Sequence, residues 1–204
     1  MLSGFAALVF PLAAALAPAP AAPAPAEAPP VTWRIDQSHS DISFRIRHLV
    51  SRVRGTFNEW SGTIVADPQN LAGGSVQVEI KTASIDTNNQ RRDTHLRSAD
   101  FFDAEKHPTI TFRSTRVQTR GRRLTVTGNL TMNGITRPVV LTGEATPPEG
   151  VAGKRRIGFE ASATINRKDF DVTWNRAAEG GGVVLGDEVE ITINIEAVEQ
   201  APAS

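Results

Sequence analysis

The side chains best suited to chemistry in this chain are those of four histidines, because imidazole is the commonest metal ligand and general base. They are His39, His48, His95 and His107, and no two of them form an HxH, HxxxH or HExxH pair. A divalent ion on His39, His48 or His95 would need the fold to bring distant residues together. The spacing therefore favours structural hydrogen bonding by these histidines, and we predict no metal site and no cofactor.

A nucleophile, a base and an acid also lie close together, as Ser38, His39 and Asp41. Neighbouring side chains of a β-strand point to opposite faces, so we predict that these three cannot meet as a triad. The serine is not part of a G-x-S-x-G motif. The paired carboxylates Asp100 and Asp103 are explained more simply as helix-end caps. The sequence therefore predicts a protein without catalytic activity.

The segment from Asn88 to Leu96 is predicted to form a short helix that covers part of a sheet or one barrel mouth. Guanidinium groups bind anions through paired hydrogen bonds. Arg91, Arg92 and Arg97 are therefore candidates for binding an anionic head group, the alternative being a solvent-exposed helix face. The basic run at residues 154–156 has the same two explanations, and its Pro- and Gly-rich surroundings favour a solvated turn.

The overall composition excludes several classes of function. The chain has 22 basic and 22 acidic residues, so no global field recruits nucleic acid or anionic lipid. It has no cysteine, which excludes disulfides, thiolate metal sites and thiol catalysis. We expect no nucleic-acid partner and no stable insertion of the mature protein into a membrane.

The N-terminal region differs from the remainder in composition. Residues 1–26 carry no charged side chain and include an Ala- and Leu-rich run, which is typical of a secretory signal peptide although the usual basic start is missing. The alternative is a disordered Ala/Pro tail. We predict a signal peptide at 1–26 with cleavage before Glu27, a linker at 27–31, one domain at 32–199 and a tail at 200–204.

The elements that must position these side chains follow from the hydrophobic pattern. Apolar and polar residues alternate with period two, which is typical of antiparallel strands with one buried face. Asn133-Gly134 between two alternating runs is a strong hairpin signal. About eight strands are expected, the clearest at 42–48, 76–81, 110–113, 124–132, 137–144, 157–165 and 189–197.

Eight such strands can bury their apolar faces by closing into a barrel, which also removes exposed edges. We therefore predict an all-β fold, an antiparallel eight-stranded barrel with one short helical insertion. The sequence does not separate a filled interior from a hollow one. If the barrel is hollow, its inward residues form an apolar tunnel suited to an alkyl or isoprenoid chain. These candidate ligand-binding residues are Phe44, Ile46, Trp60, Ile64, Val78, Ile80, Phe102, Ile110, Phe112, Val126, Leu130, Met132, Phe159 and Ile191.

The connection between the last two predicted strands, residues 166–182, is unusually long. Connections of this length can act as lids over a binding site. Phe170 and Trp174 within it are expected to belong to the core. The run Gly180-Gly181-Gly182 lacks the Lys-Ser/Thr of a phosphate loop, so it predicts a flexible loop.

The chain contains the ordered segments WRIDQSHSDISFRIRHL at 33–49, RRDTHLRSADFFD at 91–103 and HPTITF at 107–112. This series of residues resembles the YceI-like family. Further matches lie at Gly55, Phe57, Gly128, Leu130, Thr131, Pro138, Val140, Asp169 and Phe170. The resemblance covers roughly residues 31–198. The resemblance implies a lipocalin-like barrel that accommodates a long isoprenoid or another amphiphile. It also implies export to the periplasm and a tendency to form a homodimer.

The leading interpretation is a non-enzymatic periplasmic protein that sequesters or carries a polyisoprenoid or other long-chain lipid in its barrel. An alternative from a different class is an envelope stress or interaction protein whose barrel is filled and whose surface binds another protein. A metal- or haem-dependent enzyme is a third interpretation, and it requires a convergence of histidines that their spacing does not indicate.

Overall fold

The computed structural model describes residues 30–151, 153–177 and 184–200. The predicted signal peptide, the linker up to residue 29, the run Gly180–Gly182 and the last four residues of the predicted tail lie outside this part. No helix of the described residues has the length and apolar character that crossing a membrane requires.

Strands make up most of the described chain. They are β1 (Val31–Ile35), β2 (Asp41–His48), β3 (Ser51–Phe57), β4 (Trp60–Ala66), β5 (Ser75–Lys81), β6 (Ile85–Asp86), β7 (Thr109–Arg120), β8 (Arg123–Met132), β9 (Ile135–Ala145), β10 (Glu149–Val151), β11 (Lys154–Asn166) and β12 (Leu185–Glu199). The helical elements are α1 (Gln90–Arg97) and the 3-10 turns η1 (Gln37–His39), η2 (Thr82–Ser84) and η3 (Arg167–Phe170).

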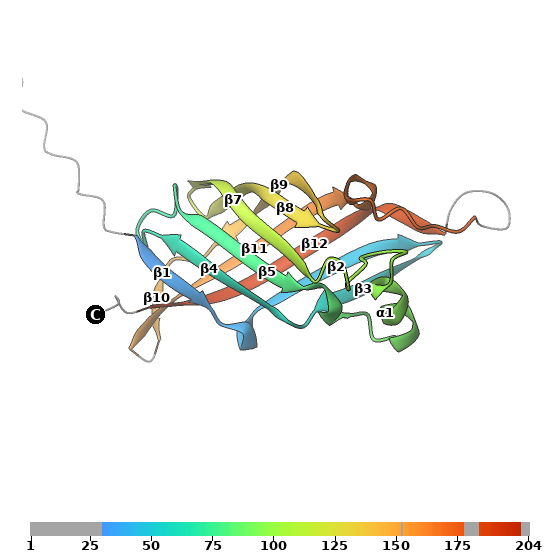
Figure 1. The fold of residues 1–204 in the computed structure, drawn as a ribbon. Coiled ribbons are helices and arrows are strands. Elements are labelled where there is room, and N and C mark those ends of the chain that lie inside the picture. The colour runs from blue at the N-terminus through green and yellow to red at the C-terminus, as the bar shows by residue number, and fades with distance from the viewer. Residues whose placement is uncertain (1–29, 152, 178–183, 201–204) are drawn as a thin grey trace, which may run out of the picture.

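Eight of these strands form a closed antiparallel barrel, which confirms the predicted fold class (Figure 1). The order around the ring is β11, β9, β8, β7, β5, β4, β1 and β12, and β12 pairs with β11 to close it. This closing pair runs from Arg156 opposite Val198 to Asn166 opposite Glu188. Because closure pairs every strand of the ring on both sides, the inward side chains line one continuous interior.

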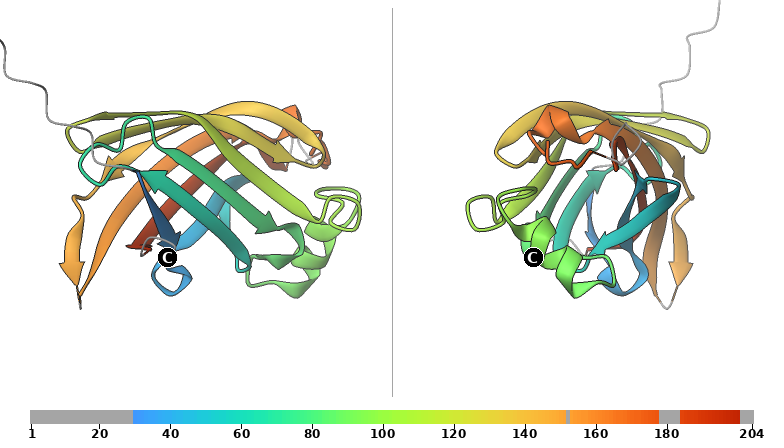
Figure 2. Two further views of the ribbon diagram at one scale, coloured as in Figure 1. Left: turned by 60° about the vertical axis from the view of Figure 1, so that its left-hand side comes forward. Right: turned by 90° about the vertical axis from the view of Figure 1, so that its right-hand side faces the viewer.

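The barrel is asymmetric because two strands share one edge of β12. β1 pairs with the C-terminal end of β12, where Ile35 lies opposite Ala197. β2 pairs with the N-terminal part, from Asp41 to His48. β3 and β6 continue the sheet beyond β2. Together with α1 they form a rim at one end, which faces the viewer on the right of Figure 2, while β1 starts and β12 ends at the other (Figure 1).

The helix α1 is fixed to this rim by a buried polar network. Asn89 caps it by accepting a hydrogen bond from the backbone N–H of Arg92, at 3.0 Å. Asp93 is buried and accepts hydrogen bonds from the backbone N–H and the hydroxyl of Thr87. The Nε of Arg92 donates to the same hydroxyl oxygen, at 2.7 Å. The helix therefore begins two residues later than predicted, since Asn89 serves as its N-terminal cap.

Two of the hairpin turns use residues that tolerate a left-handed backbone. Asn133 and Gly134 connect β8 to β9 with φ of 51° and 75°, as the Asn-Gly signal predicts. Gly121, between β7 and β8, has φ 61°. These turns set the register that places alternate residues of β7, β8 and β9 in the interior.

We predict that Gly143→Ala destabilises the barrel by about 3 kcal/mol, because the added methyl group overpacks the close approach between the paired strands β9 and β11. A Cβ at this position would lie 1.8 Å from the carbonyl oxygen of Glu160 and 2.6 Å from the Cα of Ala161. Urea unfolding followed by circular dichroism measures the change. Gly150→Ala is the control, since no atom lies within 4 Å of its added Cβ, and equal stability of the two variants would contradict the close β9–β11 contact.

Candidate functional site

The barrel encloses an inner cavity of about 170 Å³. Its lining comes from strands all around the ring and is apolar except at Ser43, Gly74 and Ser75. Such a lining gives almost no partner to a polar group, so an apolar group enters at a much smaller desolvation cost than a polar one. The cavity is therefore chemically suited to hydrocarbon.

A second, outer cavity of about 650 Å³ lies beneath α1, η3 and the β2–β3 hairpin. The two cavities share five lining residues, which are Phe44, Phe57, Met132, Ile165 and Ile191. The same side chains border both spaces, so the two cavities adjoin, one in the interior of the barrel and the other at its rim. We call the two adjoining cavities together the tunnel and the rim end its mouth.

The tunnel lining agrees with most of the residues expected from strand alternation. Phe44, Met132 and Ile191 line both cavities, and Ile46 and Phe102 line the outer one. The inner cavity is bordered by Ile64, Val78, Ile80, Ile110, Phe112, Val126, Leu130 and Phe159. Trp60 differs: it is buried in the core, yet it borders neither of these two cavities.

Sequence reasoning missed several lining residues. Phe57 and Ile165 continue the alternation of β3 and β11, so the period-two pattern could have identified them. Val172 and Trp174 lie after η3 in irregular structure, where no period indicates which side chains turn inward. Phe170 is buried in the core, as predicted, whereas Trp174 borders the outer cavity.

Arg167 holds this irregular segment over the mouth and is itself only 3% exposed. Its guanidinium donates hydrogen bonds to the carbonyl oxygens of Gly186, Val172 and Trp174. Burial lowers the pKa of this guanidinium, and the nearby carboxylate of Asp187 opposes that shift. An arginine stays charged even after such a shift. A permanent cation therefore ties residues 171–176, which we call the lid segment, to β12.

Polar side chains gather at the mouth, and the three predicted head-group arginines are placed differently there. Arg91 borders the outer cavity, and its guanidinium makes no hydrogen bond or ion pair with any described residue. Arg92 also borders it, but its guanidinium is bound to Thr87. Arg97 donates instead to the carbonyl oxygens of Ala83 and Ile85, away from both cavities. Of the three, Arg91 is the one placed to meet a ligand.

His95 occupies the same rim and is fixed in position by three neighbours. Its Nε2 lies 2.8 Å from an Oδ2 of Asp100. Its ring packs edge-on against Phe101 and Trp174, with centroid separations of 5.0 and 4.9 Å. Both His48 and His95 border the outer cavity. The mouth therefore combines aromatic surface with polar groups.

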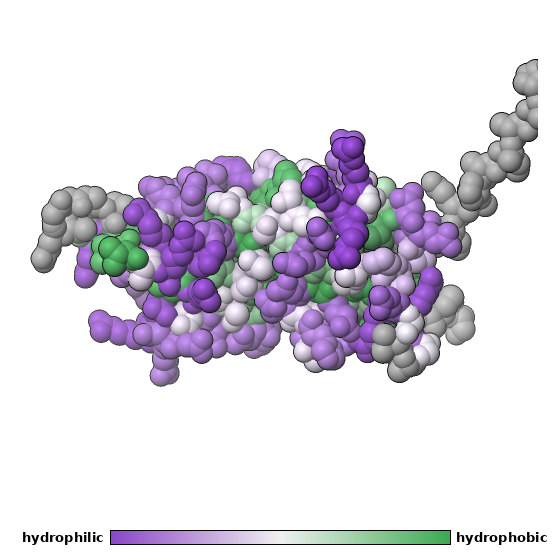
Figure 3. All heavy atoms as spheres, turned by 180° about the vertical axis from the view of Figure 1, so that it is seen from behind, coloured by the Kyte–Doolittle hydropathy of each residue, from purple (hydrophilic) through white to green (hydrophobic). Residues whose placement is uncertain are grey.

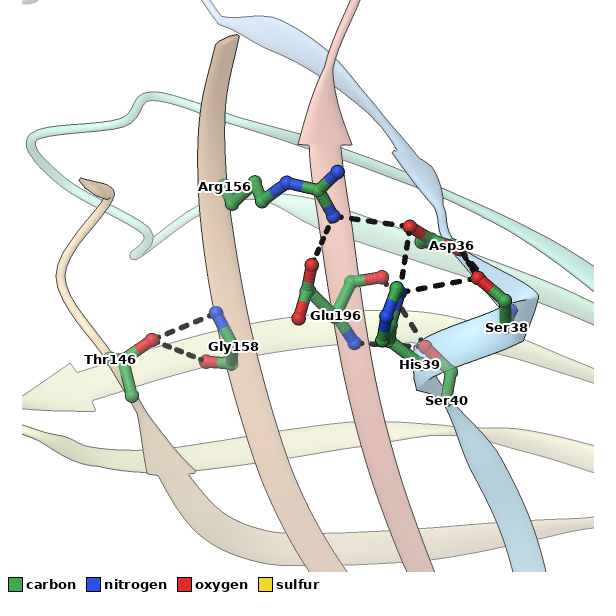
Figure 4. A network of polar contacts seen from close by, with 8 residues as sticks. All are labelled: Asp36, Ser38, His39, Ser40, Thr146, Arg156, Gly158 and Glu196. Carbon is green, nitrogen blue, oxygen red and sulfur yellow. Dashed lines mark hydrogen bonds and ion pairs between the residues drawn. The ribbon is translucent and has the colours of Figure 1, made fainter. Parts of the chain in front are cut away.

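His39 belongs to a separate cluster at the end of β1 (Figure 4). Asp36, His39 and Glu196 are the single group of three potential metal ligands that lie close together in the described residues. Arg156 contacts Oδ2 of Asp36 at 3.1 Å and also contacts Glu196. A single guanidinium thus contacts both carboxylates, which is the arrangement of an ion-pair network that joins the end of β1 to β11 and β12.

The prediction that Ser38 and His39 point to opposite faces is wrong. They lie in the 3-10 turn η1 and not in a strand, and their Oγ and Nδ1 atoms are 3.2 Å apart. The acid beside them is Asp36, whose Oδ1 accepts from Ser38 at 2.6 Å and whose Oδ2 lies 3.1 Å from Nδ1 of His39. A proton relay uses both imidazole nitrogens, whereas here serine and carboxylate both meet Nδ1.

These hydrogen bonds lower the pKa of Asp36, the bond from Ser38 contributing most, followed by those from His39 and Arg156. The side chain of Asp36 thus stabilises the turn as a carboxylate. Two further candidates lie elsewhere. His107 borders neither cavity, and Asp103 binds Lys106 at 2.8 Å.

The fold and the two cavities define a closed β-barrel with an internal apolar site, and the comparisons with known proteins agree with this fold. The model of the YceI-like domain matches residues 33–197. "Protein YceI" of Salmonella agona is 39% identical over 203 residues, covering 96% of this chain and 95% of its own. The Salmonella arizonae protein is 42% identical over 175 residues, covering 82% and 87%. The chain belongs to the YceI-like family.

Solved structures share the same barrel. The Campylobacter jejuni YceI protein is 35% identical, with a TM-score of 0.67 over 81% of this chain and 96% of its own. Burkholderia cenocepacia BcnA is 25% identical, with a TM-score of 0.69 over 79% and 98%. A polyisoprenoid-binding domain from Saccharophagus degradans has a TM-score of 0.61 over 83% and 99% at 14% identity, which shows a common fold.

We predict that Arg167→Leu lowers the free energy of unfolding by about 3 kcal/mol, because three carbonyl oxygens near β12 lose their donor. Trp174 should also become more accessible to the quencher acrylamide. The matched control is Arg91→Leu at the exposed rim, which should change stability by less than about 0.5 kcal/mol. Equal effects of the two substitutions would show that Arg167 does not hold the lid segment.

Acid should weaken the network around Asp36. Its pKa is lowered in the folded protein, so its contribution to stability is complete above the ordinary carboxyl pKa of about 4 and is lost as the pH falls through the folded value. Urea midpoints should therefore be flat from pH 7 to about 5 and fall below it. Asp36→Asn should be less stable at pH 7 and decline less steeply in acid, and an unchanged profile would contradict this role.

Proposed function

We propose that this chain is a non-enzymatic periplasmic protein that sequesters or carries a polyisoprenoid or another long-chain amphiphilic lipid inside its barrel. The observation that supports this most directly is the tunnel, in which an inner cavity of about 170 Å³ adjoins an outer one of about 650 Å³. The family membership and the shared barrel of a polyisoprenoid-binding domain support the same class of ligand.

Apolar burial supplies the affinity in this proposal. Each buried methylene contributes about 0.8 kcal/mol, so ten methylenes contribute about 8 kcal/mol before the cost of ordering the chain. Met132 and Phe44 stand where the cavities meet. The flexible thioether of methionine and the flat ring of phenylalanine adapt to ligands of different shape.

The polar head is proposed to stay at the mouth, because the inner lining offers almost no hydrogen-bonding group. Arg91 is the proposed primary contact, with His48 and His95 beside it on the same rim. Arg92 contributes by holding the start of α1 through Thr87. Arg97 holds the other end of α1 to the same rim, because its guanidinium donates hydrogen bonds to the carbonyl oxygens of Ala83 and Ile85.

Export and processing form part of the proposal. We infer that residues 1–26 direct the chain to the periplasm and are removed before Glu27. N-terminal sequencing of the protein recovered from the periplasm tests this, with Glu27 expected as the first residue. Light scattering of the same material tests the proposed homodimer.

The test of cargo is native mass spectrometry of protein purified from its own envelope fraction without detergent. A stoichiometric additional mass, identified by denaturing extraction as an isoprenoid or acyl lipid, is expected. A bare protein mass, together with no uptake of added polyisoprenoid, would refute the carrier and favour a filled barrel that acts through protein partners.

We predict that Ala161→Phe shortens the chain that the tunnel accepts. Ala161 borders the inner cavity, and the larger ring would displace about three methylenes, which corresponds to about 2.4 kcal/mol or about 50-fold in affinity for long chains. Short chains should bind almost as before. The dissociation constants of a graded series of fluorescent fatty alcohols measure this.

Ser162→Phe is the matched control for Ala161→Phe. It adds the same side chain on the neighbouring residue of β11, which is exposed on the outer face of the barrel. Both variants should keep the cooperative thermal transition of the parent protein. If the two variants bind long chains equally well, the inner cavity is not part of the binding site.

A further inference from the structure

The hairpin between β2 and β3 ends in an exposed apolar tip. Its two-residue turn consists of Leu49 and Val50, between the last residue of β2 and the first of β3. Leu49 is 46% exposed and Val50 is fully exposed. Figure 3 shows hydrophobic surface at this end of the molecule, bordered by strongly hydrophilic surface. Apolar side chains in this position contribute nothing to the core.

The turn is also unfavourable for its own backbone. Leu49 has φ 54°, and a bulky residue rarely adopts this left-handed region. Two-residue hairpin turns prefer glycine at such a position. The same chain places Asn133-Gly134 in the β8–β9 turn. Because an observed outlier of this kind motivates a functional explanation, the tip calls for a role outside folding.

The flanking strands carry a second feature that does not favour folding. Arg45 lies directly opposite Arg54, and Arg47 directly opposite Arg52. Like charges at opposite positions of an antiparallel pair are destabilising. These four arginines share the outer face of the hairpin, because they alternate with residues that border the tunnel.

Acidic groups near the hairpin neutralise this charge only in part. Arg45 and Arg52 both contact the same carboxylate, that of Glu190. Arg47 is close enough to help lower the pKa of Asp187, but this carboxylate is bound mainly by Lys168. The guanidinium of Arg54 makes no hydrogen bond or ion pair with any described residue, and only its backbone is paired, in the β2–β3 ladder. The charge of the whole chain is balanced, so the excess of positive charge is local to this hairpin.

The inner face of the same hairpin forms part of the tunnel mouth. Ile46, His48 and Val53 border the outer cavity. The backbone N–H of Leu49 donates to the carbonyl oxygen of Val184 at 2.8 Å, which ties the tip to the segment before β12. One rigid hairpin therefore presents a tunnel wall on one face, arginines on the other and an apolar tip beyond both.

We propose that this hairpin docks the protein on an anionic phospholipid bilayer. Leu49 and Val50 enter the interfacial region of the bilayer, and the flanking guanidiniums bind lipid phosphates. The tip is too small for a typical protein interface, which buries about 800 Å² on each partner. Nucleic acid would leave the apolar side chains of Leu49 and Val50 exposed to water. Docking in this orientation brings the tunnel mouth to the membrane surface, so that a lipid can enter with little exposure to water.

This proposal extends the proposed function without depending on the identity of the cargo. Docking is measured by co-sedimentation of the mature protein, which begins at Glu27 in the proposed processing, with phosphatidylcholine vesicles that contain either no phosphatidylglycerol or about 30% of it, a fraction chosen to give a strongly negative surface. The unaltered protein should bind the anionic vesicles at least tenfold better, and added salt should weaken binding by screening. All variants begin at the same residue, so any contribution of the N-terminal residues cancels in the comparison.

Two variants test the two components. Leu49→Gly with Val50→Ser should lose about tenfold in vesicle binding, because apolar insertion is removed, and should melt at an equal or higher temperature, because glycine suits the turn. Arg47→Gln with Arg54→Gln should lose about 25-fold, about fivefold for each arginine at a charged lipid surface. The matched controls are Val140→Ser and Arg116→Gln, at exposed positions of β9 and β7, which should stay within about twofold.

The outcomes separate docking from cargo binding. No binding of the unaltered protein to anionic vesicles, or equal binding by hairpin and control variants, would overturn the docking proposal. Uptake of a fluorescent fatty alcohol from aqueous solution should be unchanged in the hairpin variants. Failure of this uptake in the unaltered protein, with docking intact, would refute the lipid carrier alone.

Discussion

The structure depends above all on the antiparallel pairing between β11 and β12. This pair closes the sheet, with Ile157 opposite Ala197 at one end and Ile165 opposite Val189 at the other. Without closure, the apolar faces of the ring strands would be open to water and the sheet would have two free edges. With closure, the same faces surround a common interior, and the inward side chains border a cavity of hydrocarbon character.

The second constraint is that β1 and β2 share one edge of β12, because it makes the two ends of the barrel different. β1 completes the ring near the chain ends, whereas β2 extends outward with β3 and β6. The outer cavity lies under this extension and the elements that pack beside it. Charged groups hold these elements from within: Arg167 ties the lid segment to β12, and Asp93 and Arg92 tie α1 to Thr87. The mouth is therefore a preformed opening with a polar rim.

The positions of the arginines show how context decides what a charged residue does. Arg92 and Arg97 were equal candidates with Arg91 by their sequence, but hydrogen bonds to the backbone and to Thr87 give them structural roles. The arginines of β2 and β3 have too few carboxylates around them for full neutralisation. A chain with balanced total charge thus has a local basic surface beside its tunnel mouth. Balance over the whole chain accordingly says little about binding at one face.

Local sequence patterns were enough to predict the class of fold and most of the interior. Period-two alternation predicted which residues of β7 and β8 point inward, because the pleat of a strand places alternate side chains on opposite faces. Asn133-Gly134 predicted its turn for the equally local reason of backbone φ. Tertiary structure alone decided that Asp36 joins Ser38 and His39 in a 3-10 turn, that Trp174 reaches the mouth, and that the interior is hollow. These features depend on contacts between segments far apart in the chain and on how completely side chains fill the closed ring. Local periodicity determines neither of the two.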